Sequence, residues 1–222
     1  MDLYEAMRTT FAAREFTDAP VNDTVLHHIL ENARFAPSGG NRQPWRIIVV
    51  RSPETRARFV KWVEPTMQRY VAQMVAGEAP FNTIHPSKVD DAALAKIPPP
   101  TAMLETMLGA PVLLLVCADL SVLAAFDADL DRVGIIGGAS VYPFAWNVLL
   151  AARAEGLAGT ITTFLAPAEA LVREHLGIPE HIVPAALVPI GHPVKQLTRL
   201  RRKSVEEITA LERWDGEPLG AG

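Results

Sequence analysis

The chain has 222 residues, of which 49% are hydrophobic and 21% charged, an ordinary globular composition that can bury a sizeable core. Its formal net charge of -4 provides no positive field that would attract nucleic acid or an acidic membrane surface. The single cysteine, Cys117, excludes an intrachain disulfide, a cysteine-rich zinc site and an iron–sulfur cluster, and this usage is typical of a reducing, cytoplasmic setting.

The first third of the chain alternates helical patterns with one strand. Residues 2–13 read as a short helix without a basic segment followed by an apolar one, so we expect no signal peptide. Val21–Arg34 places its apolar residues on one helical face. A polar loop follows, then a strand at Trp45–Val50 and an amphipathic helix over 53–75.

The next segment is irregular and rich in proline. From Gly77 to Pro100 neither a helical nor a strand period survives. A loop of this length inside a compact domain is usually functional or disordered. We therefore expect a lid or insertion at about residues 64–100.

The second half of the chain supplies the centre of the predicted fold. A helix near Ala102–Leu108 precedes the continuous apolar run APVLLLVCA, which suits a central strand. Residues 133–152 carry no charge over a length that could span a bilayer. Three glycines and several polar residues dilute the hydrophobicity of that segment, so we expect a buried helix.

The chain closes with short elements and a tail. We expect a strand at Gly159–Thr163, a helix at Ala166–Leu176, a last strand in IVPAALVPIGHP and an arm at about residues 195–222. No internal repeat and no linker divides the sequence. The pattern therefore predicts one α+β domain, spanning residues 1–222, with helices packed on a sheet.

The polar loop before the first strand is the most unusual segment. Its sequence PSGGNRQPW, residues 37–45, places two glycines beside serine, asparagine, arginine and glutamine. Glycine lets backbone N–H groups approach a ligand closely, and the polar side chains can bond a heteroaromatic edge or a sugar chain. A solvent-exposed turn explains the same composition about as well. The sequence holds no Walker-type phosphate cradle and no G-x-G-x-x-G after a strand.

The tail carries a basic run directly before a predicted helix start. The capping-box sequence SVEE at residues 204–207 is preceded by Arg199, Arg201, Arg202 and Lys203. Free N–H groups at a helix start beside guanidinium groups suit a phosphate. A solvated basic run is the more ordinary interpretation of this segment on its own.

Other candidate residues give weaker signals. Thr160 and Thr162 share one face of their predicted strand and Thr163 turns away, but threonine is common in strands. Arg14 follows the first helix, where a surface arginine is ordinary. His27 and His28 are adjacent on a helix and cannot both face one metal, and the other four histidines have no carboxylate at ligand spacing, so no metal site is expected. Cys117 falls in the predicted core.

Taken in chain order, these segments resemble the nitroreductase-like flavoprotein family over nearly the whole sequence. AREF with TDAPV is similar to the first flavin loop of the family, and APSGGNRQPWR to its most recognisable signature. NVLLAARAEGLAGTITTF resembles the central helix and flavin-edge segment, and VPIGHP with RRKSVEEI resembles the terminal strand and phosphate arm. The TITTF segment looks more like the deiodinase-type branch than the enteric nitroreductase branch.

The resemblance implies an α+β sandwich whose central, mostly antiparallel sheet is flanked by helices. It also implies an intertwined homodimer with FMN at each subunit interface. The activity would be hydride transfer from NADH or NADPH through flavin N5 to an electron-poor acceptor such as a nitroaromatic or a quinone. No side chain stands out as a catalytic acid, so the flavin itself would carry the chemistry.

The resemblance further assigns roles to individual residues. Arg14 would lie near the N1/O2 edge of the flavin, and Thr162 or Thr163 near N5/O4. Arg201 and Lys203 would hold the phosphate. The ring and ribityl chain would be contacted from the polar loop by Pro37, Ser38, Gly39, Asn41 and Gln43. The pocket of the partner chain would be approached by Tyr142, Pro143 and Phe144.

One departure from the family pattern affects the phosphate. Many relatives carry Arg-Arg-Ser just before the position of Arg14, whereas this chain has the sequence TFA at residues 10–12. Phosphate binding would then depend on Arg201 and Lys203, with Arg8 or Thr10 as further candidates.

Two alternative functions remain open at this level. The first is a reductive dehalogenase or a specialised biosynthetic flavoenzyme, and the second is a flavin-binding or storage protein without turnover. The deiodinase branch binds an amino-acid zwitterion through an acid, a tyrosine and a lysine of its lid. Glu64, Tyr70 and Lys88 fall in the corresponding segment of this chain but do not align securely.

Overall fold

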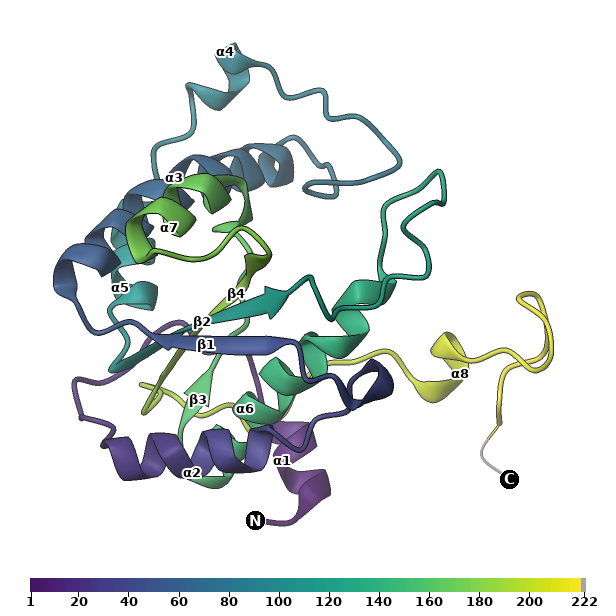
Figure 1. Ribbon diagram of the computed structural model, residues 1–222. Helices are drawn as coiled ribbons and strands as arrows, with labels where there is room; N and C mark the ends of the chain where they lie inside the picture. Colours follow the sequence, from purple (N-terminus) through teal and green to yellow (C-terminus); the bar gives the residue numbers. More distant parts are fainter. Residues whose placement is uncertain (221–222) are drawn as a thin grey trace.

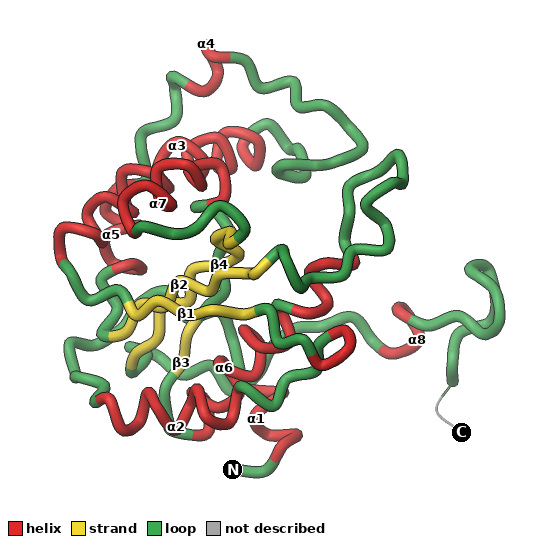
Figure 2. Tube along the Cα trace, viewed as in Figure 1, coloured by secondary structure: helices red, strands yellow, loops and turns green. Residues whose placement is uncertain are grey.

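The computed structural model describes residues 1–220. Its centre is a four-stranded sheet in the order β1-β2-β4-β3, in which every neighbouring pair is antiparallel. Helices cover both faces of this sheet (Figures 1 and 2). The strands are β1 (Trp45–Val49), β2 (Val112–Asp119), β3 (Ala158–Gly159) and β4 (Ile182–Gly191). The predicted α+β sandwich around an antiparallel sheet is therefore confirmed.

The sheet is built around β2, whose eight residues are all buried. Alternate side chains of a strand point to opposite faces, and β2 supplies both. Leu114 and Val116 pack into the core on one face, and Leu113 and Leu115 pack into a separate core on the other. The continuous apolar run is thus explained by helical cover on two sides. Cys117 lies in the second core as predicted, and burial raises the pKa of its thiol to about 11.

Two layers of helices sandwich the sheet (Figure 1). The first layer contains α1 (Leu3–Thr9), α2 (Asp23–Ala33) and α6 (Tyr142–Ala154), and the second contains α3 (Pro53–Val75), α5 (Thr101–Leu108) and α7 (Glu169–Leu176). Two further α-helices are single turns, α4 (Asp91–Leu94) and α8 (Val205–Ile208). Three short segments are 3₁₀ helices: η1 (Gly39–Asn41), η2 (Ile136–Ser140) and η3 (Ala166–Ala168).

The helix predicted over residues 133–152 starts later than expected. Residues 136–140 form η2, and α6 begins only at Tyr142. A Cβ added to Gly138 would lie 3.0 Å from the Tyr142 ring, so this approach of chain to ring depends on glycine. One face of α6 is buried, as expected, against the first core. Within residues 1–220, no helix is long and apolar enough to cross a bilayer.

Two predicted elements are shorter in the structure, and they contact each other. The first helix ends at Thr9, and Ala13 N donates to Gly159 O at 3.0 Å. β3 has only two residues, because Pro189 on the facing strand has no N–H to donate. Pairing resumes at Thr162, which exchanges two hydrogen bonds with Leu187 at 2.9 and 2.8 Å. The predicted strand at Gly159–Thr163 is therefore interrupted.

The irregular segment begins after α3, which continues through Val75, so residues 64–75 are helical. Three α3 side chains tether the region that follows: Gln68 donates to Ile97 O, Gln73 accepts from Phe81 N, and Glu64 accepts from the Thr101 hydroxyl. The segment extends outward beyond the α3 layer (Figure 1). Its role as a lid stays a prediction.

The tail first lies beside the N-terminal segment and then leaves the body. Thr17 N donates to His192 O at 2.9 Å, and Val194 N donates to Glu15 O at 3.2 Å. Beyond this point the chain projects away from the sandwich and carries α8 (Figure 1). The predicted capping box is confirmed, because the Ser204 hydroxyl accepts from Glu207 N and the Glu207 carboxylate accepts from Ser204 N.

The half-buried Arg56 ties α3 to the sheet and to α5 through carbonyl oxygens. Its guanidinium donates to Val50 O at 2.9 and 3.2 Å, just after β1. It also donates to Leu108 O and Ala110 O at 3.0 and 2.5 Å, at the carboxyl end of α5. These carbonyls would otherwise lack partners at the end of a helix, so Arg56 acts as a C-terminal cap supplied from another element.

We expect Arg56→Met to destabilise the fold by roughly 2–3 kcal/mol, because it removes charge-assisted hydrogen bonds to partly buried carbonyls. Arg58→Met is the matched control on the same helix, since Arg58 is exposed and pairs only with Glu54 four residues away. Its expected cost is below about 0.5 kcal/mol. Urea unfolding of both variants measures the difference, and equal midpoints would contradict the capping role.

Candidate functional site

The polar loop at residues 37–43 is held in an unusual backbone conformation. Gly40 has a φ of 59°, and Asn41 and Gln43 have φ of 53° and 50°, a region that residues other than glycine rarely adopt. Ser38 Oγ accepts from Gln43 N at 2.9 Å, and Gln43 Nε2 donates to Asn41 Oδ1 at 3.2 Å. Strained, cross-bonded loops of this type tend to occur at ligand sites.

The sequence suggested that both glycines expose backbone N–H groups to a ligand, whereas the structure gives each glycine a different role. Gly39 N donates to Ser140 Oγ at 3.0 Å, which joins the loop to η2, so this N–H is already used within the chain. Gly40 instead supplies the left-handed turn. Pro37, Asn41 and Gln43 are exposed and Ser38 is half-buried, so their side chains can meet a ligand at the surface.

The loop is anchored by an aromatic pair. Trp45 stacks on Phe144 with ring centroids 5.1 Å apart and an interplanar angle of 15°, and both rings are buried. Phe144 therefore lies in the core of its own chain. Of the three residues predicted to approach a partner's pocket, only Tyr142 and Pro143 are accessible.

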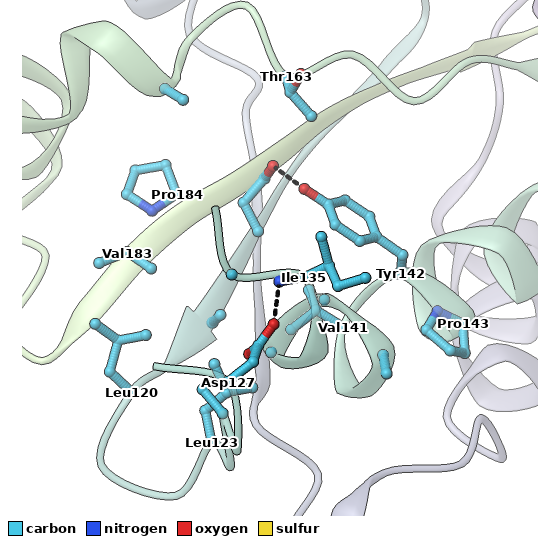
Figure 3. Close-up of a pocket in the computed structure, with 18 of the residues that line it drawn as sticks. Leu120, Leu123, Asp127, Ile135, Val141, Tyr142, Pro143, Thr163, Val183 and Pro184 are labelled. Carbon is cyan, nitrogen blue, oxygen red and sulfur yellow. Dashed lines mark hydrogen bonds between the residues drawn. The ribbon is translucent and has the colours of Figure 1, made fainter. Parts of the chain in front are cut away.

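A cavity of about 960 Å³ opens beside the start of α6 (Figure 3). Its walls are the ends of β2 and β4, the first turn of α6, the segment after Thr162, and the loop between β2 and η2. The Tyr142 hydroxyl reaches Ala185 O on β4 at 3.5 Å. The cavity thus brings Thr163, a predicted flavin contact, together with Tyr142 and Pro143.

The residue next to Thr163, Thr162, lies beside this cavity and carries a buried hydroxyl group. Its side chain is buried, and its hydroxyl has no partner among the described residues. Native proteins rarely leave such a group unsatisfied, because an unpaired buried hydroxyl costs free energy. A donor or acceptor on a bound group would satisfy it. The predicted flavin contact at this residue is therefore compatible with the geometry.

Arg14 lies where the N-terminal segment crosses the sheet edge. It lies two residues after Ala12, which forms a bridge with Gly159, and it is exposed, with a hydrogen bond to Ala12 O at 3.3 Å. Arg14 is thus close in structure to the 158–163 segment, two parts of the chain that the sequence separates by more than 140 positions. Arg201 and Lys203 are exposed on the projecting arm, beyond the point where the tail leaves this segment.

A model of the nitroreductase family matches residues 7–192. This chain belongs to the nitroreductase family. It is accordingly an enzyme of the flavin oxidoreductase class. Iodotyrosine deiodinase of Nematostella vectensis is 27% identical over 213 residues, covering 95% of this chain and 75% of its own. NADH dehydrogenase of Thermus thermophilus is 28% identical over 197 residues, covering 88% of each chain.

Solved structures share the fold. The NADPH:FMN oxidoreductase of Vibrio harveyi, solved with NAD+, gives a TM-score of 0.68 at 21% identity and covers 96% of this chain and 77% of its own. A protein described as a nitroreductase from Desulfovibrio desulfuricans, solved with FMN, gives 0.66 at 21% identity, with 96% and 98% covered. The resemblance stated from the sequence is confirmed, including its deiodinase-like features.

The residues that replace the family's Arg-Arg-Ser are not free to bind phosphate. Thr10 is buried, and its hydroxyl donates to Ala6 O at 2.8 Å within α1. Arg8 is exposed and lies over the Tyr4 ring, with 5.9 Å between guanidinium carbon and ring centroid. Of the two further phosphate candidates, Arg8 and Thr10, only Arg8 therefore has an accessible polar group, its guanidinium.

The three residues considered for zwitterion recognition contact different parts of the chain. Glu64 accepts from the Thr101 hydroxyl at 2.7 Å, and Tyr70 packs edge-on against Phe164 with centroids 5.3 Å apart. Lys88 lies on the irregular segment, where its N–H donates to Glu78. None of the three lines the cavity. Elsewhere in the described chain, no three His, Cys, Asp or Glu side chains gather closely enough to hold a metal ion.

The sequence did not indicate Asp127, which organises the cavity wall. Its buried carboxylate accepts from Ile135 N at 2.7 Å (Figure 3). It also accepts from Ile136 N at 3.3 Å and from the Arg132 guanidinium at 2.8 Å. The bond from Ile135, followed by the charge and bonds of Arg132 and Ile136, holds the pKa of Asp127 below its usual value. An aspartate between apolar residues gives no periodic signal, so only the fold reveals this role.

We expect Asp127→Asn to loosen residues 127–136. The variant replaces one carboxylate oxygen by an amide NH₂ group, which cannot accept hydrogen bonds from the N–H donors that this carboxylate meets. The amides of Ile135 and Ile136 should exchange hydrogen for deuterium faster, while those of β2 stay protected. Asp129→Asn, on the exposed side of the same loop, is the matched control.

In the wild type, the stability of the closed loop at residues 127–136 should depend on pH. A lowered pKa means that the closed loop is favoured above the ordinary aspartate range, near 3.8, and loses that support as pH falls through the pKa of the folded state. Hydrogen–deuterium exchange, corrected for the intrinsic exchange rates at each pH, measures the effect of the substitution and the effect of pH. Unchanged protection of Ile135 in Asp127→Asn would contradict the role given to this carboxylate.

Proposed function

We propose that this chain is an FMN-dependent oxidoreductase that takes hydride from NADH or NADPH and delivers it to an electron-poor acceptor such as a nitroaromatic or a quinone. Its membership of the nitroreductase family supports the flavin, and relatives whose names include FMN, NADPH and NAD(P)H support the cofactor pair. The observation that carries the proposal is the buried hydroxyl of Thr162, which has no partner in the described part of the chain and lies beside a cavity large enough for a ring system.

FMN, when bound, would supply the chemistry of hydride transfer, and the chain would bind, orient and polarise it. Thr162 would hold a hydrogen bond at the N5/O4 edge, and Thr163 would face the acceptor from the cavity. Arg14 would place a fixed cation near N1/O2, where it favours negative charge. Ser38, Asn41 and Gln43 would contact the ring or ribityl chain, and Arg201 and Lys203 the phosphate.

The active unit would be an intertwined homodimer. The arm that leaves the body exposes apolar side chains that ordinarily require cover: Val205, Ile208, Leu211 and the fully exposed Trp214. Tyr142 and Trp146 at the start of α6 are likewise accessible. A second copy that received this arm would bury these residues. It would also bring basic residues of the arm toward a flavin. We place this dimer in the cytoplasm, on the cysteine usage of the sequence.

A reductive dehalogenase is the second candidate, favoured by the deiodinase relatives. Against that candidate, Glu64, Tyr70 and Lys88 do not line the cavity beside Tyr142. A storage protein without turnover is the third. The assays that follow distinguish a catalyst from a storage protein.

The purified protein should be yellow and should release FMN when heated. Under anaerobic conditions, NADH or NADPH should bleach the flavin, and a nitroaromatic or quinone should restore the colour. Chromatography of the released flavin and stopped-flow absorbance measure the two steps. FAD as the main released species, or no colour after FMN is supplied during refolding, rejects the cofactor. A flavin that stays oxidised with both nicotinamides indicates storage.

The two ends of the flavin should respond differently to loss of charge. Arg201→Ala should weaken FMN binding by roughly 10- to 100-fold, because a charge-assisted hydrogen bond is worth on the order of 1.5–3 kcal/mol. Arg213→Ala is the matched control on the same arm, since Arg213 is paired with Asp215. Arg14→Ala should instead make the midpoint potential more negative, and Arg14→Lys should restore part of it.

The FMN dissociation constant and the midpoint potential are measured for all four variants. An unchanged dissociation constant in Arg201→Ala would remove this residue from the phosphate site. An unchanged potential in Arg14→Ala would show that its charge lies away from the flavin ring.

A further inference from the structure

The polar loop at residues 37–43 is fastened to the body of the protein at both of its ends. Near its start, Gly39 N donates to Ser140 Oγ at 3.0 Å, although the two residues are 101 positions apart in the sequence. Just after its end, the ring of Trp45 stacks on that of Phe144. Ser140 is the last residue of η2, and Phe144 lies in the first turn of α6. One short segment of the chain therefore holds both ends of the loop.

The backbone between these two anchors is the strained part of the loop. Gly40, Asn41 and Gln43 have positive φ angles of 59°, 53° and 50°. Asn41 N donates to Ser38 O at 2.9 Å and Gln43 N donates to Ser38 Oγ at 2.9 Å, so the loop is also closed on itself. Backbone conformations of this kind persist only where surrounding contacts hold them. The internal bonds shape the loop, and the anchors at its ends fix where that shape lies.

Ser140 provides the polar one of the two anchors. Its side chain is buried within its own chain, so its bond to Gly39 does not depend on cover by a second copy. A Cβ added to Gly39 would lie 3.5 Å from Ser140 Oγ, which places loop and η2 in direct contact. Without this oxygen, the part-buried N–H of Gly39 would lose its acceptor, at a cost in free energy. Alanine at position 140 cannot supply the acceptor.

We propose that Ser140 is a positioning residue for the cofactor, because it holds the loop at residues 37–43 in the conformation that receives the flavin. This inference rests on the proposed function, which assigns contacts with the flavin ring or ribityl chain to Ser38, Asn41 and Gln43. A loop that is already ordered loses little conformational entropy when its ligand binds. Without the Ser140 hydroxyl, the loop samples other conformations and releases the flavin sooner.

Ser140→Ala tests this role, because it removes the acceptor with little change in size. Hydrogen–deuterium exchange of the protein as purified is the first measurement. The amides of Gly39 and Gln43 should exchange at least about tenfold faster in the variant, while those of β1 stay protected. The second measurement is the release of FMN after dilution, followed by the rise in fluorescence of the free flavin. Release should be about tenfold faster from Ser140→Ala than from the wild type.

Thr55→Val is the matched control for the loss of a buried hydroxyl. The Thr55 hydroxyl lies 3.0 Å from His175 Nε2 and joins α3 to α7, in the helical layer on the other face of the sheet. This variant should lower the midpoint of urea unfolding about as much as Ser140→Ala does. Its loop exchange and its rate of FMN release should nevertheless equal those of the wild type. Equal acceleration of release in both variants would reduce Ser140 to a contribution to overall stability.

Two further results would overturn the proposal. Unchanged exchange of the loop amides in Ser140→Ala would reject the anchor, and faster exchange with unchanged release of FMN would reject its role toward the cofactor. Failure of the proposed function is a separate result, because it is read in the wild type from the released flavin and from bleaching by nicotinamide. A flavin-loaded, reducible wild type whose Ser140→Ala variant keeps the wild-type release rate would reject this inference alone.

Discussion

The burial of β2 on both faces is the constraint on which the rest of the structure depends. A strand in the middle of an antiparallel sheet can satisfy its backbone through β1 and β4, but its side chains need apolar cover above and below. The two helical layers provide that cover as two separate cores. The residues proposed to bind the cofactor lie where the strands end or pair incompletely, or on the arm, outside these cores.

The edges of the sandwich hold polar groups in ways that cores cannot. β3 stops after two residues opposite Pro189, and just beyond it the buried hydroxyl of Thr162 has no partner within residues 1–220. At the end of β2 the chain enters a loop whose shape depends on the carboxylate of Asp127. The strained loop at residues 37–43 is fixed by Trp45 stacked on Phe144. In each case a rigid element positions an irregular one.

The basic residues proposed to meet the cofactor lie outside the cavity beside Tyr142. Arg14 and the basic residues of the arm are exposed, where they can meet an anionic group. The wall of the cavity has one carboxylate, and its partners neutralise it. The chain belongs to the nitroreductase family, whose model matches residues 7–192.

The sequence by itself determined the fold class, the order of the main helices and strands, and the family, because long periodic segments and the PSGGNRQPW signature are local properties. It also placed the Ser204 capping box, which lies within four residues. Only the tertiary structure decided that Phe144 is internal, that Thr10 is occupied, and that Asp127 closes the cavity wall. These outcomes depend on which distant segments meet, and a one-dimensional pattern does not contain that information.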